Sequence, residues 1–282
     1  MIDTFSLRIA ALILFVVPVF GQGTPIQPCP ATPAPAKTSV TSGPRATRLP
    51  VDEQVPDDPD VKKMLAPYSE RVRELSSVVG RLESNLNKTG AGGGSVGNFV
   101  ADAMKAYATK QGHPVVLAIM NAGGLRKNEI SAGDLRVSDI FELLPFENAL
   151  VAVDVSGVQL AKLIEIVTRD AQSGARIHFK WNDRSRPEFL SGKLVDEHGN
   201  EYDIDPQKTY TIVTIDYLLG LHSGAYAILQ EAKSRTPLNI TLRDSVLDYV
   251  KSETASGRAI RPVVDNRWVQ VGPDRKTTEP PQ

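Results

Sequence analysis

The sequence VVLAIMNAGGLR, residues 115–126, joins a wholly apolar run to a turn with two adjacent glycines. A short apolar run that ends at turn residues is typical of a buried strand. Gly123 and Gly124 allow close backbone approach, and Asn121 and Arg126 flank them with hydrogen-bonding groups. Taken alone, the pattern favours a strand-ending turn with a solvated arginine over a ligand loop.

The amino-acid composition and net charge limit the classes of protein to which this chain can belong. The 282 residues include 41% hydrophobic residues, enough for a sizeable core. The net charge of -1 and the isoelectric point near 6.4 give no bias toward polyanions. We therefore expect no nucleic acid partner.

Both ends of the chain differ in composition from the middle. Residues 1–21 combine a polar start with an apolar run too short to span a bilayer, which predicts a cleaved signal peptide and a periplasmic or secreted protein, with no membrane span after cleavage. Residues 22–59 are rich in Pro and Thr and predict a disordered tether, and residues 272–282 a disordered tail. The one cysteine, Cys29, is expected to be a bystander. One domain remains, residues 60–271.

Within that domain the hydrophobic period keeps changing between helix and strand. An apolar stripe at helical spacing follows a Gly-rich loop, with Ser95 as the expected N-cap; its members are Val96, Phe99, Val100, Ala103 and Tyr107. A second helix is expected after Ser156. We predict further helices over 60–75, 137–146 and 242–253, and strands in 76–86, 115–120, 148–157, 175–181, 189–196, 200–204, 210–215 and 267–271. Helices and strands that alternate without a strict repeat predict an α/β (α+β) fold, a mixed sheet with flanking helices.

Five short motifs occur in an order that is typical of one family. They are SVGNFVADAM, NAGGLR, LPFEN, VSGVQL and DPQKTYTIVTIDYLLG. Together they resemble the C-terminal, substrate-binding domain of the 5'-nucleotidase and UDP-sugar hydrolase family, over residues 75–271. Each motif alone is weak, but five in the family's order are a strong signal.

The resemblance implies a division of labour between two domains. In that family an N-terminal metallophosphoesterase domain holds two metal ions, and the C-terminal domain grips the nucleoside and carries it to the metals. This sequence resembles only the gripping half, so we expect no catalytic residue, no metal site and no cofactor in it, with divalent metals on a separate metallophosphoesterase chain. The four histidines are far apart in sequence, and no G-N-H motif occurs.

One string imitates a metal motif. Residues 196–199 read D-E-H-G, which matches D-x-H-G, a motif of dimetal phosphatases. They stand between GKLV and EYDI, where Gly199 and Asn200 suit a tight hairpin connection. We interpret the string as a turn.

The family's ligand residues carry over position by position. Asn121 matches a base contact and Arg126 a phosphate-side arginine, with Gly123 and Gly124 giving close approach. The resemblance further implies an aromatic sandwich for the nucleobase, a second base-side contact and a pocket glycine; the matching positions are Phe146, Tyr217, Asn148 and Gly174.

Two positions depart from the family pattern. Arginines that meet the phosphate usually precede the SVGN helix, whereas this chain has GAGGGS. The aspartate of G-G-D-G-[FY], which binds the ribose diol, is replaced in HSGAY, residues 222–226, unless Ser223 or Asp216 takes its role.

Three hypotheses follow from this pattern. The chain is a nucleotide-recognition half that works with a separate metallophosphoesterase, a stand-alone module that binds a nucleotide or a related phosphoester, or a degenerate interaction domain. Activity of this chain as a hydrolase by itself is not expected, because no nucleophile and base pair is visible in the sequence.

Overall fold

The structure is a computed structural model that describes residues 55–261 and 265–273. The predicted signal peptide, nearly all of the tether and most of the tail lie outside the described residues. No helix in the described ranges is long and apolar enough to cross a membrane.

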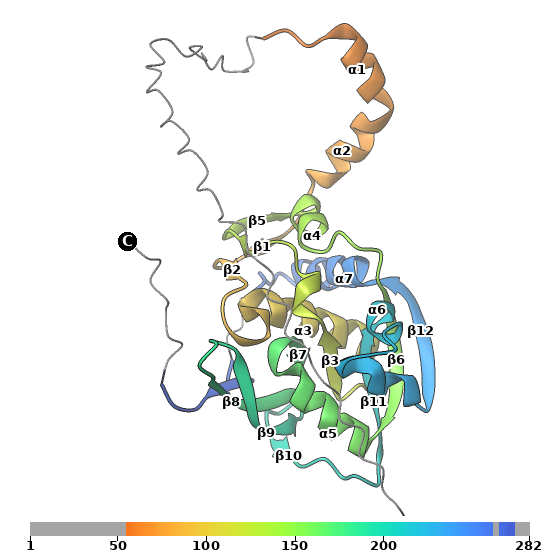
Figure 1. Cartoon of the computed structure of the whole chain (residues 1–282). Helices are drawn as coiled ribbons and strands as arrows, with labels where there is room; N and C mark the ends of the chain where they lie inside the picture. The colour runs from red at the N-terminus through yellow and green to blue at the C-terminus, as the bar shows by residue number, and fades with distance from the viewer. Residues whose placement is uncertain (1–54, 262–264, 274–282) are drawn as a thin grey trace, which may run out of the picture. The chain divides into compact units, whose positions relative to one another are not determined.

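The main sheet has five strands in the order β12-β6-β11-β3-β7 (Figure 1). Strand β11 runs parallel to β3, and every other neighbouring pair is antiparallel. All four residues of β3 are buried, as the apolar run predicted. The strands are β3 (Leu117–Met120), β6 (Ala149–Ser156), β7 (Ala171–Ser173), β11 (Thr209–Ile215) and β12 (Ser234–Thr241).

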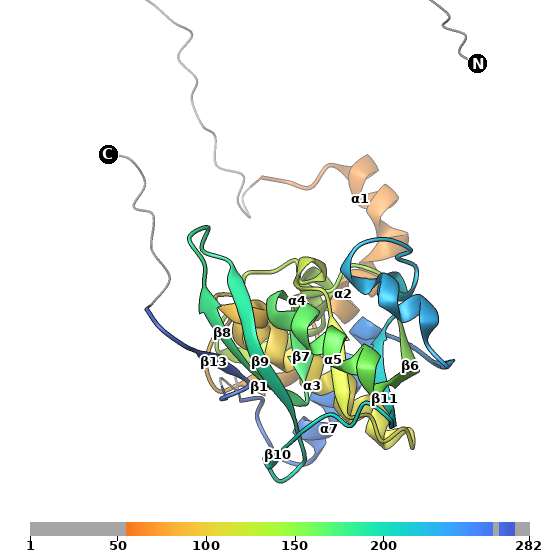
Figure 2. The same cartoon turned by 60° about the horizontal axis from the view of Figure 1, so that its bottom comes forward.

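A second sheet has four strands in the order β10-β9-β8-β13 (Figure 2). They are β8 (Ala175–Trp181), β9 (Pro187–Val195), β10 (Glu201–Tyr202) and β13 (Trp268–Gln270). The predicted last strand therefore exists, but it pairs with β8 in this second sheet. Two small ladders complete the strands: β1 (Val78–Leu82) with β5 (Gly133–Arg136), and β2 (Leu86–Asn87) with β4 (Glu129–Ile130).

Helices flank the sheets, which confirms the predicted mixed α/β fold class. The long helix α3 (Gly94–Lys110) buries Val96, Phe99, Val100 and Ala103 of the predicted stripe. The other α-helices are α1 (Pro59–Leu65), α2 (Ser69–Leu75), α4 (Val137–Leu143), α5 (Gly157–Ile166), α6 (Asp216–Leu219) and α7 (Leu242–Ala255). Short 3-10 turns are η1 (Ala66–Tyr68), η2 (Ala91–Gly93), η3 (Ala122–Gly124), η4 (Val167–Arg169) and η5 (Ala225–Glu231).

The two predicted N-caps have different outcomes. Ser156 caps α5 through a reciprocal capping box with Gln159, as expected. Ser95 does not cap α3; that prediction was wrong. Gly93, with φ of 80°, is the N-cap, and Ser95 lies inside the first turn, where its hydroxyl accepts a hydrogen bond from the Asn87 N–H at 2.9 Å. The serine therefore fastens the preceding strand to the helix.

Candidate functional site

Three strands of the main sheet place the predicted ligand residues at one end of the strands. This end, where β3 and β11 finish and β6 begins, is the Arg126 edge. Strand β3 ends at Met120, immediately before the turn, and the parallel strand β11 ends two residues before Tyr217. Strand β6 is antiparallel to β11, with Leu150 opposite Ile215, so the segment that precedes β6 lies at this edge too. That segment carries Phe146 and Asn148. The topology thus gathers all the predicted site residues except Gly174.

Arg126 and Phe146 form the central pair of this edge. The guanidinium carbon of Arg126 lies 5.9 Å from the centroid of the Phe146 ring, within cation–π range. The Arg126 N–H donates to the Leu143 carbonyl at 2.9 Å, which holds the turn against the end of α4. Phe146 is 48% exposed and Tyr217 is 52% exposed. Two aromatic rings therefore stand open to solvent at an edge that also presents a guanidinium.

Asn121 contributes a buried hydrogen-bond acceptor to the turn. Its Oδ1 is buried and makes no hydrogen bond within the part of the chain that the structure describes. A Cβ at Gly123 would lie 3.4 Å from Asn121 Nδ2, and one at Gly124 would lie 2.9 Å from Met120 Cε. The two glycines let the turn fold closely around the asparagine, whose unpaired oxygen is costly unless a donor reaches it.

Asp170, which carries no local sequence signal, fastens the turn from the segment before β7. It directly precedes β7, whose Ala171 pairs with Met120. The Ala122 N–H donates to Asp170 Oδ1 at 2.8 Å, and the Tyr226 hydroxyl donates to Oδ2 at 2.6 Å. Burial, together with the carboxylate, raises the pKa of the Tyr226 hydroxyl far above its ordinary value, so it stays a proton donor.

A buried arginine supports the segment that carries Phe146. Arg243 is only 6% exposed, and it pairs with Glu147 and donates to the Leu144 carbonyl at 3.3 Å. Its guanidinium lies 4.0 Å from the centroid of the Phe141 ring. The backbone of half-buried Asn148 adds a second tie, because its carbonyl accepts from the Leu242 N–H at 2.7 Å.

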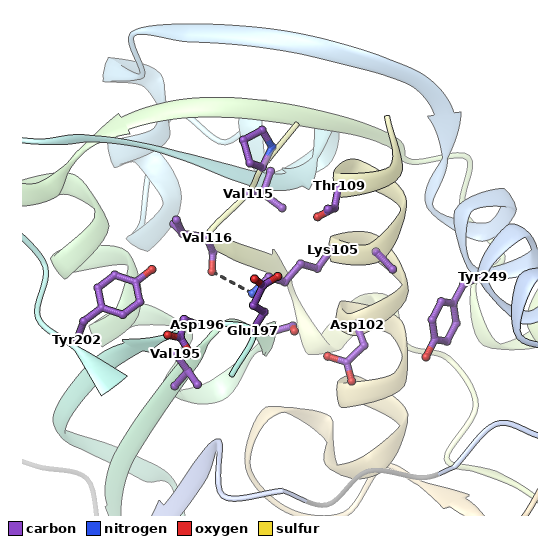
Figure 3. Close-up of a pocket in the computed structure, with 13 residues that line it drawn as sticks. Asp102, Lys105, Thr109, Val115, Val116, Val195, Asp196, Glu197, Tyr202 and Tyr249 are labelled. Atoms are coloured by element: carbon purple, nitrogen blue, oxygen red, sulfur yellow. Dashed lines mark hydrogen bonds between the residues drawn. The ribbon is translucent and has the colours of Figure 1, made fainter. Parts of the chain in front are cut away.

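Gly174 lies at the opposite end of the strands from the Arg126 edge, because β7 is antiparallel to β3. It follows β7, and a Cβ there would lie 2.0 Å from the Val116 carbonyl oxygen and 3.0 Å from Lys105 Nζ. It lines a cleft of about 340 Å³ that shares Lys105, Ser173 and Glu197 with a neighbouring cleft of about 720 Å³. Figure 3 shows the larger cleft, with Lys105 reaching toward the Val116 carbonyl. Gly174 is thus separate from the Arg126 edge.

The D-x-H-G string lies in the hairpin that joins β9 to β10. The Asp196 side chain accepts from the backbone N–H groups of His198 and Asn200 at 2.9 and 2.8 Å, and the Gly199 N–H donates to the Asp196 carbonyl. In the described ranges, no group of three or more His, Cys, Asp or Glu side chains is arranged to hold a metal ion. The carboxylate of Asp196 therefore stabilises the hairpin turn by accepting hydrogen bonds from its backbone.

Known proteins show the same architecture and sequence pattern. The family model for the 5'-nucleotidase C-terminal domain matches residues 77–231. The trifunctional nucleotide phosphoesterase protein YfkN of Bacillus subtilis is 24% identical over 79% of this chain and 16% of its own length. Protein UshA of Yersinia enterocolitica is 26% identical over 58% of this chain and 30% of its own length. The chain therefore spans less than a third of either relative.

Solved structures agree on the fold. A 5'-nucleotidase precursor from Thermus thermophilus has a TM-score of 0.61 and 23% identity, over 79% of this chain and 45% of that one. The NAD nucleotidase of Haemophilus influenzae has a TM-score of 0.56 and 19% identity, over 76% and 42% of the two chains. With the family model matching more than half of the sequence, the chain belongs to the 5'-nucleotidase C-terminal domain family.

Proposed function

We propose that this chain is an exported nucleotide-recognition domain that works with a separate metallophosphoesterase chain in nucleotide hydrolysis. The observation that carries the proposal is the placement of the Arg126 guanidinium 5.9 Å from the exposed ring of Phe146. A stacking surface and a cation side by side match the two ends of a nucleotide, its base and its phosphate.

Each group has a defined part in binding. Stacking on an aromatic ring contributes about 1–3 kcal/mol per base and tolerates any base. The Phe146 and Tyr217 rings are the groups that would receive the base, with Asn121 Oδ1 as an acceptor for an exocyclic amine. The guanidinium of Arg126 would bind phosphate oxygens through charge-assisted bonds. The bound phosphate would then be held in a fixed place for a second protein to attack.

The catalytic metals are assigned to the partner. Two divalent ions would activate water and clamp the phosphoryl oxygens, a task that takes several His and Asp ligands close together. The four histidines of this chain are scattered along the sequence. The relative from Bacillus subtilis is named as a nucleotide phosphoesterase, and the chain matches only a small part of it. Export to the periplasm or outside the cell rests on the apolar run in residues 1–21.

Calorimetric titration of the full chain with AMP tests recognition. The wild type should bind AMP, and Phe146→Ala should weaken binding by about tenfold, consistent with the loss of one stacking contact. Leu190→Ala is the matched control, because Leu190 is also exposed but lies on β9 in the second sheet.

Mixing experiments test the partnership. The chain should release no phosphate from AMP by itself, and adding a metallophosphoesterase that carries D-x-H-G and G-N-H-[DE] should start chelator-sensitive release. AMP binding without any activity in the mixture would favour a stand-alone binding module. The absence of binding to AMP, UMP and their nucleosides, alone or in the mixture, would rule out recognition and leave an interaction domain.

A further inference from the structure

Lys88 lies beside the Asn121–Arg126 turn although it is far from it in sequence. It follows β2, which pairs with β4 just after the turn. Its N–H donates to the Asn128 carbonyl at 2.8 Å, and its Nζ donates to the Leu125 carbonyl at 2.7 Å. Because Leu125 directly precedes Arg126, the ammonium group is held next to the guanidinium-bearing residue.

Lys88 and Arg126 carry positive charges that no carboxylate in the described part of the chain neutralises at close range. Within residues 55–261 and 265–273, no carboxylate lies within 4 Å of either side-chain cation. Lys127, the next residue along, contrasts with them, since its Nζ lies 2.8 Å from Asp139 and 2.7 Å from Glu142. In these ranges the charge of Lys127 is therefore compensated by carboxylates, whereas the charges of Lys88 and Arg126 are not.

The electrostatic environment of Lys88 reflects this. Burial of the amine lowers its pKa, and the positive charge of Arg126 lowers it further. Like charges held together raise the free energy of the empty site, and an anion between them relieves the repulsion. The juxtaposition therefore favours an anionic occupant.

The glycine loop explains why a cation comes from Lys88 and not from the loop itself. Gly93 has φ of 80°, and a Cβ there would lie 2.9 Å from Leu125 Cδ1. A side chain at that position would be strained by the left-handed backbone and would press on the Leu125 side chain. Lys88 precedes the loop and reaches the same turn through its long flexible stem.

We propose that Lys88 and Arg126 together bind the phosphate of a phosphomonoester whose aromatic part stacks on Phe146. This inference rests on the proposed function and names the residue that supplies the second positive charge. An ammonium group has three donors. One is spent on the Leu125 carbonyl, which leaves two for phosphate oxygens. A dianionic phosphate suits two cations better than a single negative charge does.

A competing role for Lys88 is purely mechanical, as a strut that shapes the turn. The two roles differ in which ligands they affect. A phosphate contact matters for AMP and not for adenosine, whereas a misshapen turn weakens both. Comparing the nucleotide with its nucleoside therefore separates them.

The test is calorimetric titration of the full chain with AMP and with adenosine. Lys88→Met should weaken AMP binding by about tenfold or more, consistent with the loss of a charge-assisted contact, and leave adenosine binding unchanged. Lys88→Arg should retain AMP binding. Lys110→Met is the control, because Lys110 pairs with Asp248 at 2.9 Å at the C-terminal end of α3. The strand that precedes Lys88 contacts α3 at Ser95, in the first turn. About 22 Å of helix separate Ser95 from Lys110.

The other outcomes are also decisive. Equal weakening of AMP and adenosine by Lys88→Met, or no change in either, overturns the role of Lys88 and leaves nucleotide recognition standing. If Lys88→Met does not fold, Lys88→Gln, which keeps a donor without the charge, replaces it.

If the wild type binds neither AMP nor adenosine, the proposed function fails, and inorganic phosphate is titrated instead. Phosphate binding that is lost in the Lys88 variant then supports the two-cation site, and no phosphate binding overturns it.

Discussion

The Tyr226 hydroxyl donates a hydrogen bond of 2.6 Å to Asp170, and the same carboxylate accepts from the Ala122 N–H at 2.8 Å. These contacts join three segments that are far apart in sequence: the turn after β3, the residue before β7 and the η5 segment. The hydrogen bond from Ala122 to the Asp170 side chain fixes the backbone between Asn121 and Arg126. It is a positioning residue for the turn.

Removing the Tyr226 hydroxyl tests this link. We expect Tyr226→Phe to lower the free energy of unfolding by about 1–3 kcal/mol, because the half-buried Asp170 side chain loses a hydrogen-bond donor. AMP binding should weaken as well, since the turn loses part of its support. Denaturant unfolding and calorimetry measure the two effects. Tyr68→Phe is the control, as Tyr68 is 63% exposed; an equal loss in both variants would contradict the positioning role.

Replacing Gly174 tests whether this residue stabilises the fold or takes part in AMP binding. It has φ of 113°, and an added Cβ would lie 2.0 Å from the Val116 carbonyl oxygen. Gly174→Ala should therefore lower the free energy of unfolding by more than about 2 kcal/mol. At temperatures where the variant is folded, its AMP affinity should equal that of the wild type, because the residue lies at the opposite edge from Arg126.

Gly199→Ala separates backbone strain from collision. Gly199 has φ of 84°, but a Cβ there would meet nothing within 4 Å. Its replacement should cost only about 1–2 kcal/mol from the left-handed conformation. Equal losses in the two glycine variants would show that the contact with Val116 is unimportant, and a selective loss of AMP binding in Gly174→Ala would return that glycine to the ligand site.

Local patterns predicted much of the fold. The apolar run before Asn121 predicted β3, and the periodicity after Ser95 predicted the buried face of α3. Strand β12 was missed because its sequence contains Pro237 and exposes most of its side chains. Both features are tolerated because β12 is an edge strand, which pairs with β6 alone among the described strands. Edge position is a tertiary property that the local pattern does not contain.

The site divides in the same way. The predicted ligand residues come from the motifs, where they are close together in sequence or match a family position, as Arg126 and Phe146 do. Asp170 and Arg243 were not found, because their roles depend on contacts with segments about 48 and 99 residues away. The placement of Lys88 beside the turn could not be predicted for a similar reason, since its partner is the carbonyl of Leu125, 37 residues away in sequence. Supporting residues of this kind leave no local signal.

Asp154 makes stability depend on pH. Hydrogen bonds from Ser234 at 2.6 Å and Thr211 at 2.7 Å hold the pKa of its carboxyl below its ordinary value and connect β12 and β11 to β6. A carboxyl with a lowered folded pKa stabilises the fold above its unfolded pKa of about 4, and that stabilisation is lost as the pH falls through the folded pKa.

The Asp154→Asn variant isolates this contribution. It should be less stable than the wild type by about 1 kcal/mol at pH 7, by the same amount at pH 5, and by progressively less below pH 4. Urea unfolding at several pH values measures the difference. Asp203→Asn is the control, because the Asp203 side chain is 83% exposed. A difference that grows as the pH falls would contradict the sign of the lowered pKa.

The sugar end of the nucleotide should be recognised weakly. The HSGAY segment has no carboxylate, and Ser223 within it is exposed. A site that hydrogen-bonds a substrate hydroxyl rejects the analogue that lacks it, whereas a site without such a bond does not. We therefore expect AMP and 2'-deoxy-AMP to bind with affinities within about threefold of each other, which is less than the effect of one good hydrogen bond.

Competition calorimetry measures the ratio of the two affinities, and Ser223→Asp, which places a carboxylate in the segment, should shift that ratio toward AMP. A wild-type preference for AMP of about thirtyfold or more would mean that a group at this edge does bind the ribose, and Ser223→Ala compared with Asp216→Asn would identify which one.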